Sequence, residues 1–146
     1  EIELMNIIRV DLVGSFRLTG EILKIMMKKR RGVIISIAST PAISGHNCGS
    51  PYSIAKAGLI CLTKHIALEY GQYNIRSYSV ALGDIDTQAM RKSLSKTELL
   101  KARNENTLKR LGRPEEIAKS IVSLAGESFS FSTGNTIIID GGKVII

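Results

Sequence analysis

Residues 34–58 read IISIASTPAISGHNCGSPYSIAKAG, and the order of residue types in this stretch decides the fold. Its beginning belongs to a β-branched run over 33–38 that is apolar on both faces, which predicts a buried strand of a parallel sheet. Ser, Gly and Asn dominate residues 40–50 and predict a loop. Pro51 suits the first turn of a helix, so we predict a helix over 51–70.

The sequence on either side continues this alternation of helix and strand. Apolar residues recur at helical spacing over 4–29 and predict one long helix. Short β-branched runs predict two more strands, over 76–81 and 135–140, with another helix over 113–126 between them. Such an order implies right-handed crossovers between parallel strands. The expected fold class is therefore α/β: a Rossmann-like, three-layer parallel sheet with helices on both faces.

Residues 84–112 follow a different pattern from the rest of the chain. They are polar, helix-prone and poor in β-branched side chains, and they predict one or two mobile helices. The whole sequence has no internal repeat, and 146 residues with 44% hydrophobic content are enough to form one core. We therefore expect a single domain.

The net charge of +7 makes a nucleic-acid-binding domain one alternative to consider. The positive residues are scattered, except for the run at 28–31, which follows the first predicted helix and complements its negative end. Aromatic residues make up only 5% of the chain, so the stacking platforms of a nucleic-acid groove are missing. We expect no nucleic-acid partner.

The cysteine content and the apolar runs bear on the location of the protein. Cys48 and Cys61 are too few for a disulfide framework and lack the spacing of a metal site. Reduced thiols are typical of cytoplasmic proteins, so that is the expected location. The longest apolar runs are as short as strands, and we expect no membrane partner and no metal.

Ser39, Tyr52 and Lys56 are the candidate catalytic residues. Sites in parallel α/β sheets form at the carboxyl ends of the strands, where Ser39 is expected. Tyr52 and Lys56 are four residues apart, which places them on one helix face with Cβ atoms about 5–6 Å apart. A hydroxyl, a phenol and a cation that favours the phenolate suit proton transfer at a carbonyl or alcohol oxygen, but a hydride needs a cofactor. On spacing alone, a Tyr–Lys pair is more often a packing pair.

The segment 34–58 closely resembles the catalytic stretch of the short-chain dehydrogenase/reductases, in which a strand ends in the catalytic serine and YxxxK follows at this distance. The likeness continues with LGRPEEIA at 111–118 and IDGG at 139–142. This resemblance implies an oxidoreductase that uses NAD or NADP and transfers a hydride to or from a secondary alcohol or ketone. Candidate substrates include 3-oxoacyl thioesters, sugars and other polyols.

The resemblance also implies roles for individual residues. Ser39 would polarise the substrate oxygen, Tyr52 would be the general acid/base, and Lys56 would support Tyr52 and bind the nicotinamide ribose. Further cofactor contacts would come from the segment after the second predicted strand, at Gly83, Ile85 and Thr87.

By the same resemblance, residues 84–112 would be a lid over the substrate. His46 and Cys48, in the loop before Tyr52, would either shape the substrate specificity or be ordinary loop residues. Members of the family are commonly dimers or tetramers that pair through the helices corresponding to 4–29 and 51–70. A homo-oligomer is therefore expected.

The sequence departs from the family pattern at two positions. The segment VDLVG at 10–14 has Asp11 where the family usually has an Asn that holds a proton-relay water, so Asp11 is a further candidate catalytic residue. Its charge would alter the pH dependence. Leu82 replaces the usual proline before Gly83, which removes a fixed backbone φ and would loosen that loop.

The Gly-rich turn that holds the pyrophosphate in this family is not found among the 13 glycines, and no predicted strand precedes the first helix. We therefore expect residues 1–146 to be the C-terminal part of a single domain whose N-terminal strands are absent from this chain. Another segment would then cover the open edge of the first strand. A truncated, non-catalytic relative with a structural or assembly role is the alternative, and the intact Ser39, Tyr52 and Lys56 argue against it.

Overall fold

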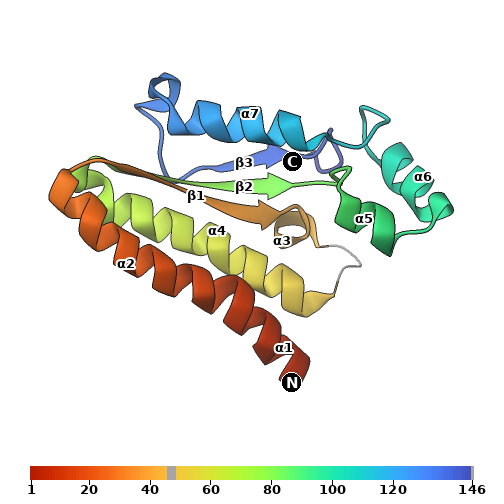
Figure 1. Cartoon of the computed structure of the whole chain (residues 1–146), viewed down its shortest axis with the longest axis horizontal. Coiled ribbons are helices and arrows are strands. Elements are labelled where there is room, and N and C mark those ends of the chain that lie inside the picture. The colour runs from red at the N-terminus through yellow and green to blue at the C-terminus, as the bar shows by residue number, and fades with distance from the viewer. Residues whose placement is uncertain (46–48, 146) are drawn as a thin grey trace.

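The sheet of this protein has three parallel strands, and the computed structural model describes residues 1–45 and 49–145 (Figure 1). The strands are β1 (Gly32–Ser39), β2 (Ile75–Leu82) and β3 (Thr136–Ile139), in the order β1-β2-β3. Ser39 pairs with Leu82, and Leu82 pairs with Ile139, so all three strands end at the same edge of the sheet. The predicted α/β class is confirmed.

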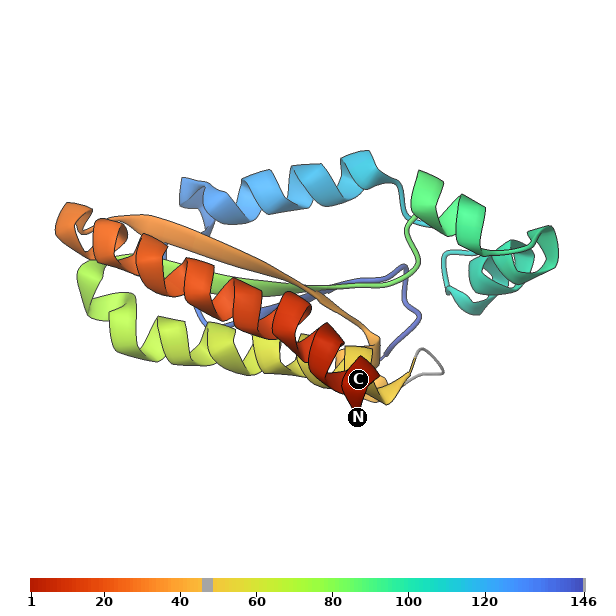
Figure 2. The same ribbon diagram turned by 60° about the horizontal axis from the view of Figure 1, so that its bottom comes forward.

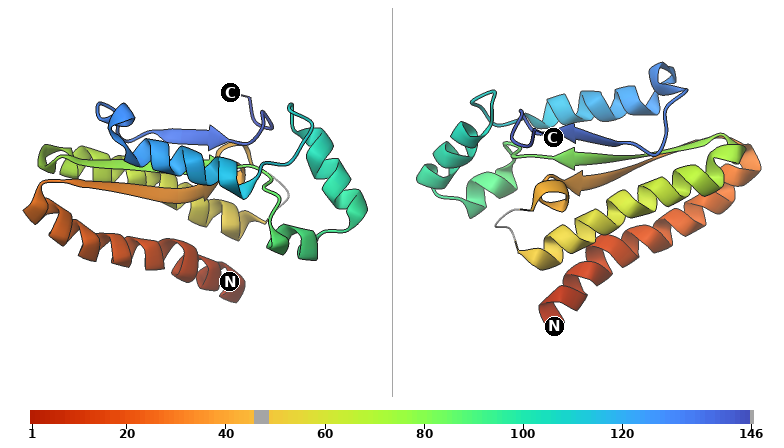
Figure 3. Two further views of the ribbon diagram at one scale, coloured as in Figure 1. Left: turned by 45° about the horizontal axis from the view of Figure 1, so that its top comes forward. Right: turned by 180° about the vertical axis from the view of Figure 1, so that it is seen from behind.

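Helices cover both faces of the sheet. Figure 2 shows α2 (Gly14–Lys29) and α4 (Ser50–Tyr70) side by side on one face and α7 (Pro114–Ala125) on the other. Figure 3 shows α5 (Gln88–Ser93) and α6 (Lys96–Glu105) beyond the edge to which the strands point. The α-helices are α1 (Ile2–Ile7), α2 (Gly14–Lys29), α3 (Pro41–Ser44), α4 (Ser50–Tyr70), α5 (Gln88–Ser93), α6 (Lys96–Glu105) and α7 (Pro114–Ala125), and a π-helical turn (Ile8–Val13) joins α1 to α2.

Two apolar clusters hold these layers together. On the α2–α4 side, the cluster is built around Leu23, Ile66 and Ile75. On the α7 side, it is built around Tyr78, Val80 and Leu124. Because β2 contributes to both clusters, its side chains are buried on both faces, as expected for the central strand of a parallel sheet.

The structure differs from the sequence-based expectation in two helical segments. The first helix is continuous, but residues 8–13 form a π-helical turn that periodicity did not predict. Gly58 of α4 packs tightly there, because a Cβ on Gly58 would lie 2.6 Å from Cδ2 of Leu12. The predicted loop 40–50 contains the short helix α3, which Pro41 begins.

Strand β1 is less buried than the sequence predicted. Among the residues that the structure describes, it pairs with β2 alone and is the edge of the sheet. Ala38 is buried, whereas the side chain of Ile37 is 39% exposed. The open edge expected for the first strand is therefore present among the described residues, on the side of β1 away from β2.

Candidate active site

Ser39 lies at the carboxyl edge of the sheet, as predicted. It is the last residue of β1, and its Oγ donates a hydrogen bond to the carbonyl oxygen of Leu82 at 3.4 Å. The backbone N–H of Thr40 donates to the same carbonyl oxygen at 3.0 Å. These two contacts to β2 fix where β1 ends, and they leave the half-buried Ser39 at the strand terminus.

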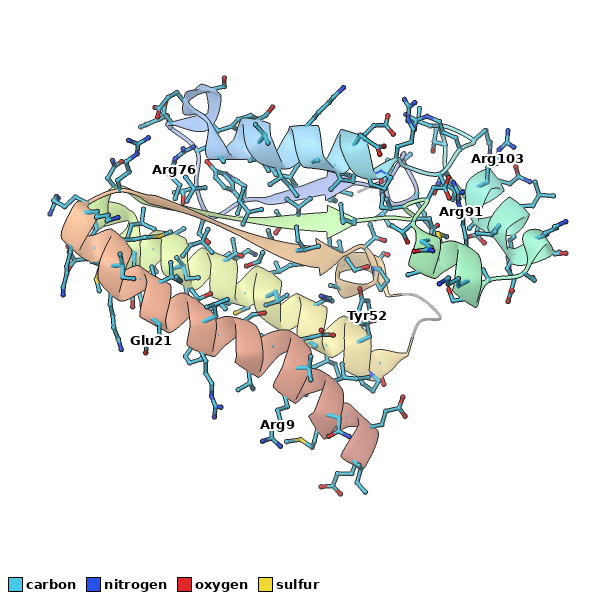
Figure 4. The ribbon with its side chains drawn as sticks, viewed as in Figure 1. Arg9, Glu21, Tyr52, Arg76, Arg91 and Arg103 are labelled. Atoms are coloured by element: carbon cyan, nitrogen blue, oxygen red, sulfur yellow. The ribbon has the colours of Figure 1, made fainter. Side chains whose placement is uncertain are left out.

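Tyr52 and Lys56 lie in the first turns of α4. The Lys56 amine lies 5.5 Å from the centre of the Tyr52 ring and donates a hydrogen bond to the Ile37 carbonyl oxygen at 3.3 Å. One amine thus contacts both the phenol of α4 and the backbone of β1, two residues before Ser39. Figure 4 shows Tyr52 projecting from α4 toward the end of β1, where α3 begins.

Asp11 and Lys56 line one groove between the first helix and β1. This groove has a volume of about 480 Å³, and Ser36 and Ile37 of β1 are also in its wall. Asp11 lies in the π-helical turn, where its carbonyl oxygen accepts a hydrogen bond from the Ser15 hydroxyl at 3.0 Å. The structure therefore brings this sequence-predicted residue to the same groove as Lys56.

Gly83, Ile85 and Thr87 follow β2 at the same edge of the sheet. Gly83 permits a close approach, since a Cβ there would lie 2.7 Å from the Cα atom of Asp140. Ile85 forms a backbone bridge with Gly112. The hydroxyl of Thr87 accepts a hydrogen bond from the Met90 N–H at 3.1 Å and caps α5. Each of these residues thus has a structural role at this edge, and the cofactor contact expected from the sequence stays a prediction.

The one or two helices expected over 84–112 are present as α5 and α6, whereas the role of this segment as a lid stays a prediction. His46 and Cys48 lie outside the described residues. Among the described residues, no helix has the length and apolar character needed to cross a membrane, and no three His, Cys, Asp or Glu side chains come together as a metal site.

Sequence reasoning missed one residue at this edge. Lys143 follows β3 and, with Thr40 and Ser44, lines a cavity of about 310 Å³ beside the end of β1. A signal for it existed, because a charged residue directly after the IDGG segment lies at a strand end, where sites of α/β sheets form.

A hydroxyl at a strand end, and a phenol with an amine against its ring, are groups that suit proton transfer at a carbonyl or alcohol oxygen. The parallel sheet with helices on both faces defines the class of Rossmann-like α/β proteins. The chain matches the family described as enoyl-(acyl carrier protein) reductase over residues 2–143, and it belongs to the short-chain dehydrogenase/reductases. The resemblance found in the sequence is confirmed.

Relatives within this family are oxidoreductases by name. The chain is 39% identical to the 3-oxoacyl-[acyl-carrier-protein] reductase of Thermotoga maritima, covering 95% of this chain and 56% of that protein. It is 38% identical to the enzyme of that name from Chlamydia trachomatis, covering 97% and 57%. The acetoin dehydrogenase structure from Salmonella typhimurium is similar with a TM-score of 0.85 at 30% identity, covering 97% and 55%. The chain thus spans about half the length of the relatives it matches.

Proposed function

We propose that this chain carries the acid–base site of an NAD(P)-dependent oxidoreductase that transfers a hydride between the cofactor and a secondary alcohol or ketone. The observation that supports this most is the position of the Lys56 amine, between the Tyr52 ring and the Ile37 carbonyl oxygen. A solvated lysine in a mere packing pair has no reason to bond to the strand that ends at Ser39. The names of the matched relatives support the same reaction class.

The residues present suit one end of a nicotinamide cofactor. An ammonium group has three N–H donors, and Lys56 donates one hydrogen bond to the Ile37 carbonyl oxygen, so donors are left for ribose hydroxyls. We propose that Tyr52 contributes to the same contact, with Gly83, Ile85 and Thr87 along the carboxamide. Bound there, either NADH or NADPH would supply the hydride.

In the reductive direction, the Tyr52 hydroxyl gives its proton to the carbonyl oxygen of the substrate while the carbonyl carbon accepts the hydride. The ketone gains one hydride and one proton and becomes an alcohol. The Ser39 hydroxyl turns away from the Leu82 carbonyl oxygen and donates its one hydrogen bond to the same substrate oxygen, where it stabilises the charge that develops. The Lys56 amine stabilises the phenolate that remains, because it lies against that ring. Oxidation follows the reverse course.

We propose that Asp11 takes part in the relay that returns a proton from solvent to Tyr52 after each reduction. It lines the groove that Lys56 also lines, and a water molecule held by its carboxylate would link the amine to solvent. Asp11→Asn keeps a group that can hold such a water but removes the charge. Turnover of that variant as a function of pH measures the contribution of the carboxylate.

The central test is the substitution Tyr52→Phe in the complete protein. With a short 3-oxoacyl thioester and NADPH or NADH as the probes, we expect turnover to fall by roughly 10²–10⁴-fold, the usual contribution of a general acid. Tyr70→Phe, at the far end of the same helix, is the matched control and should keep its turnover. A Tyr52→Phe enzyme that retains turnover within a few-fold would reject the assigned role and favour the non-catalytic alternative.

The substrate, partners and location belong to this proposal. A 3-oxoacyl thioester is the first substrate to test because several relatives carry that name, followed by sugars and other polyols. We propose that N-terminal strands of the complete protein cover the open side of β1, and that the protein forms a cytoplasmic homo-oligomer, a dimer or tetramer, through α2 and α4.

A further inference from the structure

Lys143 forms an ion cluster at the carboxyl edge of the sheet. Its amine lies 2.7 Å from a carboxylate oxygen of Asp84 and 3.1 Å from one of Glu105, and its side chain is only 12% exposed. Burial alone would lower the pKa of Lys143, but the hydrogen bonds with Asp84 and Glu105 outweigh it and raise the pKa above its usual value. The side chain is therefore a cation held between two carboxylates.

The two carboxylates stand at opposite ends of the α5–α6 segment. Asp84 lies between β2 and α5, and Glu105 is the last residue of α6. A single amine therefore joins the place where the chain leaves the sheet with the place where the segment returns to it. Figure 3 shows this segment beyond the strand ends, attached to the rest of the molecule there.

The turn that carries Lys143 is itself fixed. The carboxylate of Asp140 accepts hydrogen bonds from the N–H groups of Gly142 at 2.8 Å and Val144 at 2.7 Å. Gly142 has a φ of 76°, a conformation that favours glycine, and its carbonyl oxygen accepts a hydrogen bond from the Thr107 hydroxyl at 2.6 Å. This turn and the end of α6 thus hold each other in a defined register.

We propose that Lys143 is a positioning residue that holds the α5–α6 segment against the strand ends and aligns it with the cavity beside Ser39. The side chain reaches both features, since it bonds to both ends of the segment and lines the cavity with Thr40 and Ser44. Removal of the amine breaks both ion pairs in a partly buried place, and so removes the link between the two ends of the segment. Only its consequence for turnover rests on the proposed function.

The first experiment is hydrogen exchange on the complete protein, followed by mass spectrometry of peptides covering 84–112. We expect Lys143→Met to speed exchange in these peptides by roughly tenfold, whereas Lys143→Arg, which keeps the charge, stays close to the wild type. Peptides of β2 report global stability and should not change. Lys24→Met is the control, because it breaks the exposed Lys24–Glu21 pair on α2, far from this cluster.

Unchanged exchange over 84–112 in Lys143→Met would overturn the proposal. If Lys143→Met unfolds as a whole, Glu105→Gln removes only one of the two contacts and decides the question by the same peptides. The second readout uses a 3-oxoacyl thioester with NADPH or NADH: we expect KM to rise about tenfold while kcat changes less than threefold. Faster exchange in Lys143→Met, together with a wild type that turns over neither the 3-oxoacyl thioester nor the sugars and other polyols, would confirm the clamp and reject the proposed function.

Discussion

Arg76 shows how much one side chain contributes to the link between the sheet and α7. Its guanidinium donates hydrogen bonds to the carbonyl oxygens of Leu124 at 3.3 Å, Ala125 at 3.2 Å, Gly126 at 3.2 Å and Phe129 at 2.8 Å. These carbonyl groups lie at or just beyond the end of α7, where intrahelical donors run out. A planar cation with several donors satisfies them at once and complements the negative end of the helix.

Arg76→Met should therefore destabilise the protein by about 1.5–3 kcal/mol, the typical contribution of a hydrogen bond to a charged group. The free energy of unfolding in urea measures it. Arg17→Met, on the exposed surface of α2, is the control and should change stability by less than about 0.5 kcal/mol. Equal losses in both variants would contradict the capping role of Arg76.

Sequence reasoning found the residues that belong to local patterns and missed those whose partners are distant in the sequence. Ser39, Tyr52 and Lys56 were found because a strand end and a helical i, i+4 spacing are local patterns. Arg76 and Lys143 were not singled out, since the partners that give them their roles lie far away in the sequence, such as Leu124 for Arg76 and Asp84 for Lys143. Only the folded chain shows which carbonyl or carboxylate groups meet these two cations.

At the scale of elements, the beginning of α7 depends on one carboxylate. Glu116 accepts two hydrogen bonds from the Arg110 guanidinium, both at 2.8 Å, and one from the Arg113 N–H at 2.9 Å. These donors, Arg110 first, lower the pKa of Glu116 from 4.5 to about 2. The carboxylate therefore closes the first turn of α7 and joins it to the segment after α6.

This lowered pKa predicts a pH dependence of stability. A carboxyl group with a lower pKa in the folded state stabilises the protein fully above its unfolded pKa of 4.5 and loses that contribution as the pH falls toward about 2. The stability difference between the wild type and Glu116→Gln should thus be largest above pH 4.5 and shrink on acidification. Urea unfolding at several pH values measures this difference, and Arg110→Met should reproduce it. A difference independent of pH would refute the assignment.

Most elements could be predicted, because their signals are periodic and punctuated by caps. The strand predicted over 33–38 spans Gly32–Ser39, and the helix predicted over 51–70 spans Ser50–Tyr70. The helix predicted over 113–126 spans Pro114–Ala125. The π-helical turn was missed because it covers only six residues, too few to show a period of their own. The short α3 was missed because one turn of helix is too brief to show a period.

At the scale of the whole molecule, the outer surface of α2 and α4 is unusually apolar. Leu68 is 82% exposed and Phe16 is 61% exposed. Ile54, Cys61 and Leu68 recur along α4 at seven-residue intervals and are all exposed. Such a seam is typical of helices that pack against other helices. A groove of about 390 Å³ between α2 and α4, lined partly by Phe16 and His65, adjoins it.

We therefore expect two copies of the protein to pack α2 and α4 against each other, and Leu68→Glu combined with Phe16→Glu to weaken this association. Burying a Leu or Phe side chain contributes roughly 1.5–3 kcal/mol, so the dissociation constant should rise at least tenfold. Sedimentation equilibrium of the complete protein measures it. Leu100→Glu, which places the same charge on an exposed apolar position of α6, is the control and should leave the association unchanged.

The substitutions at Leu68 and Phe16 lie on the outer face of the helices, whereas Lys56 contacts β1. The separated subunits should therefore keep the Tyr52–Lys56 contact. An unchanged assembly in the double variant would place the interface elsewhere on the molecule.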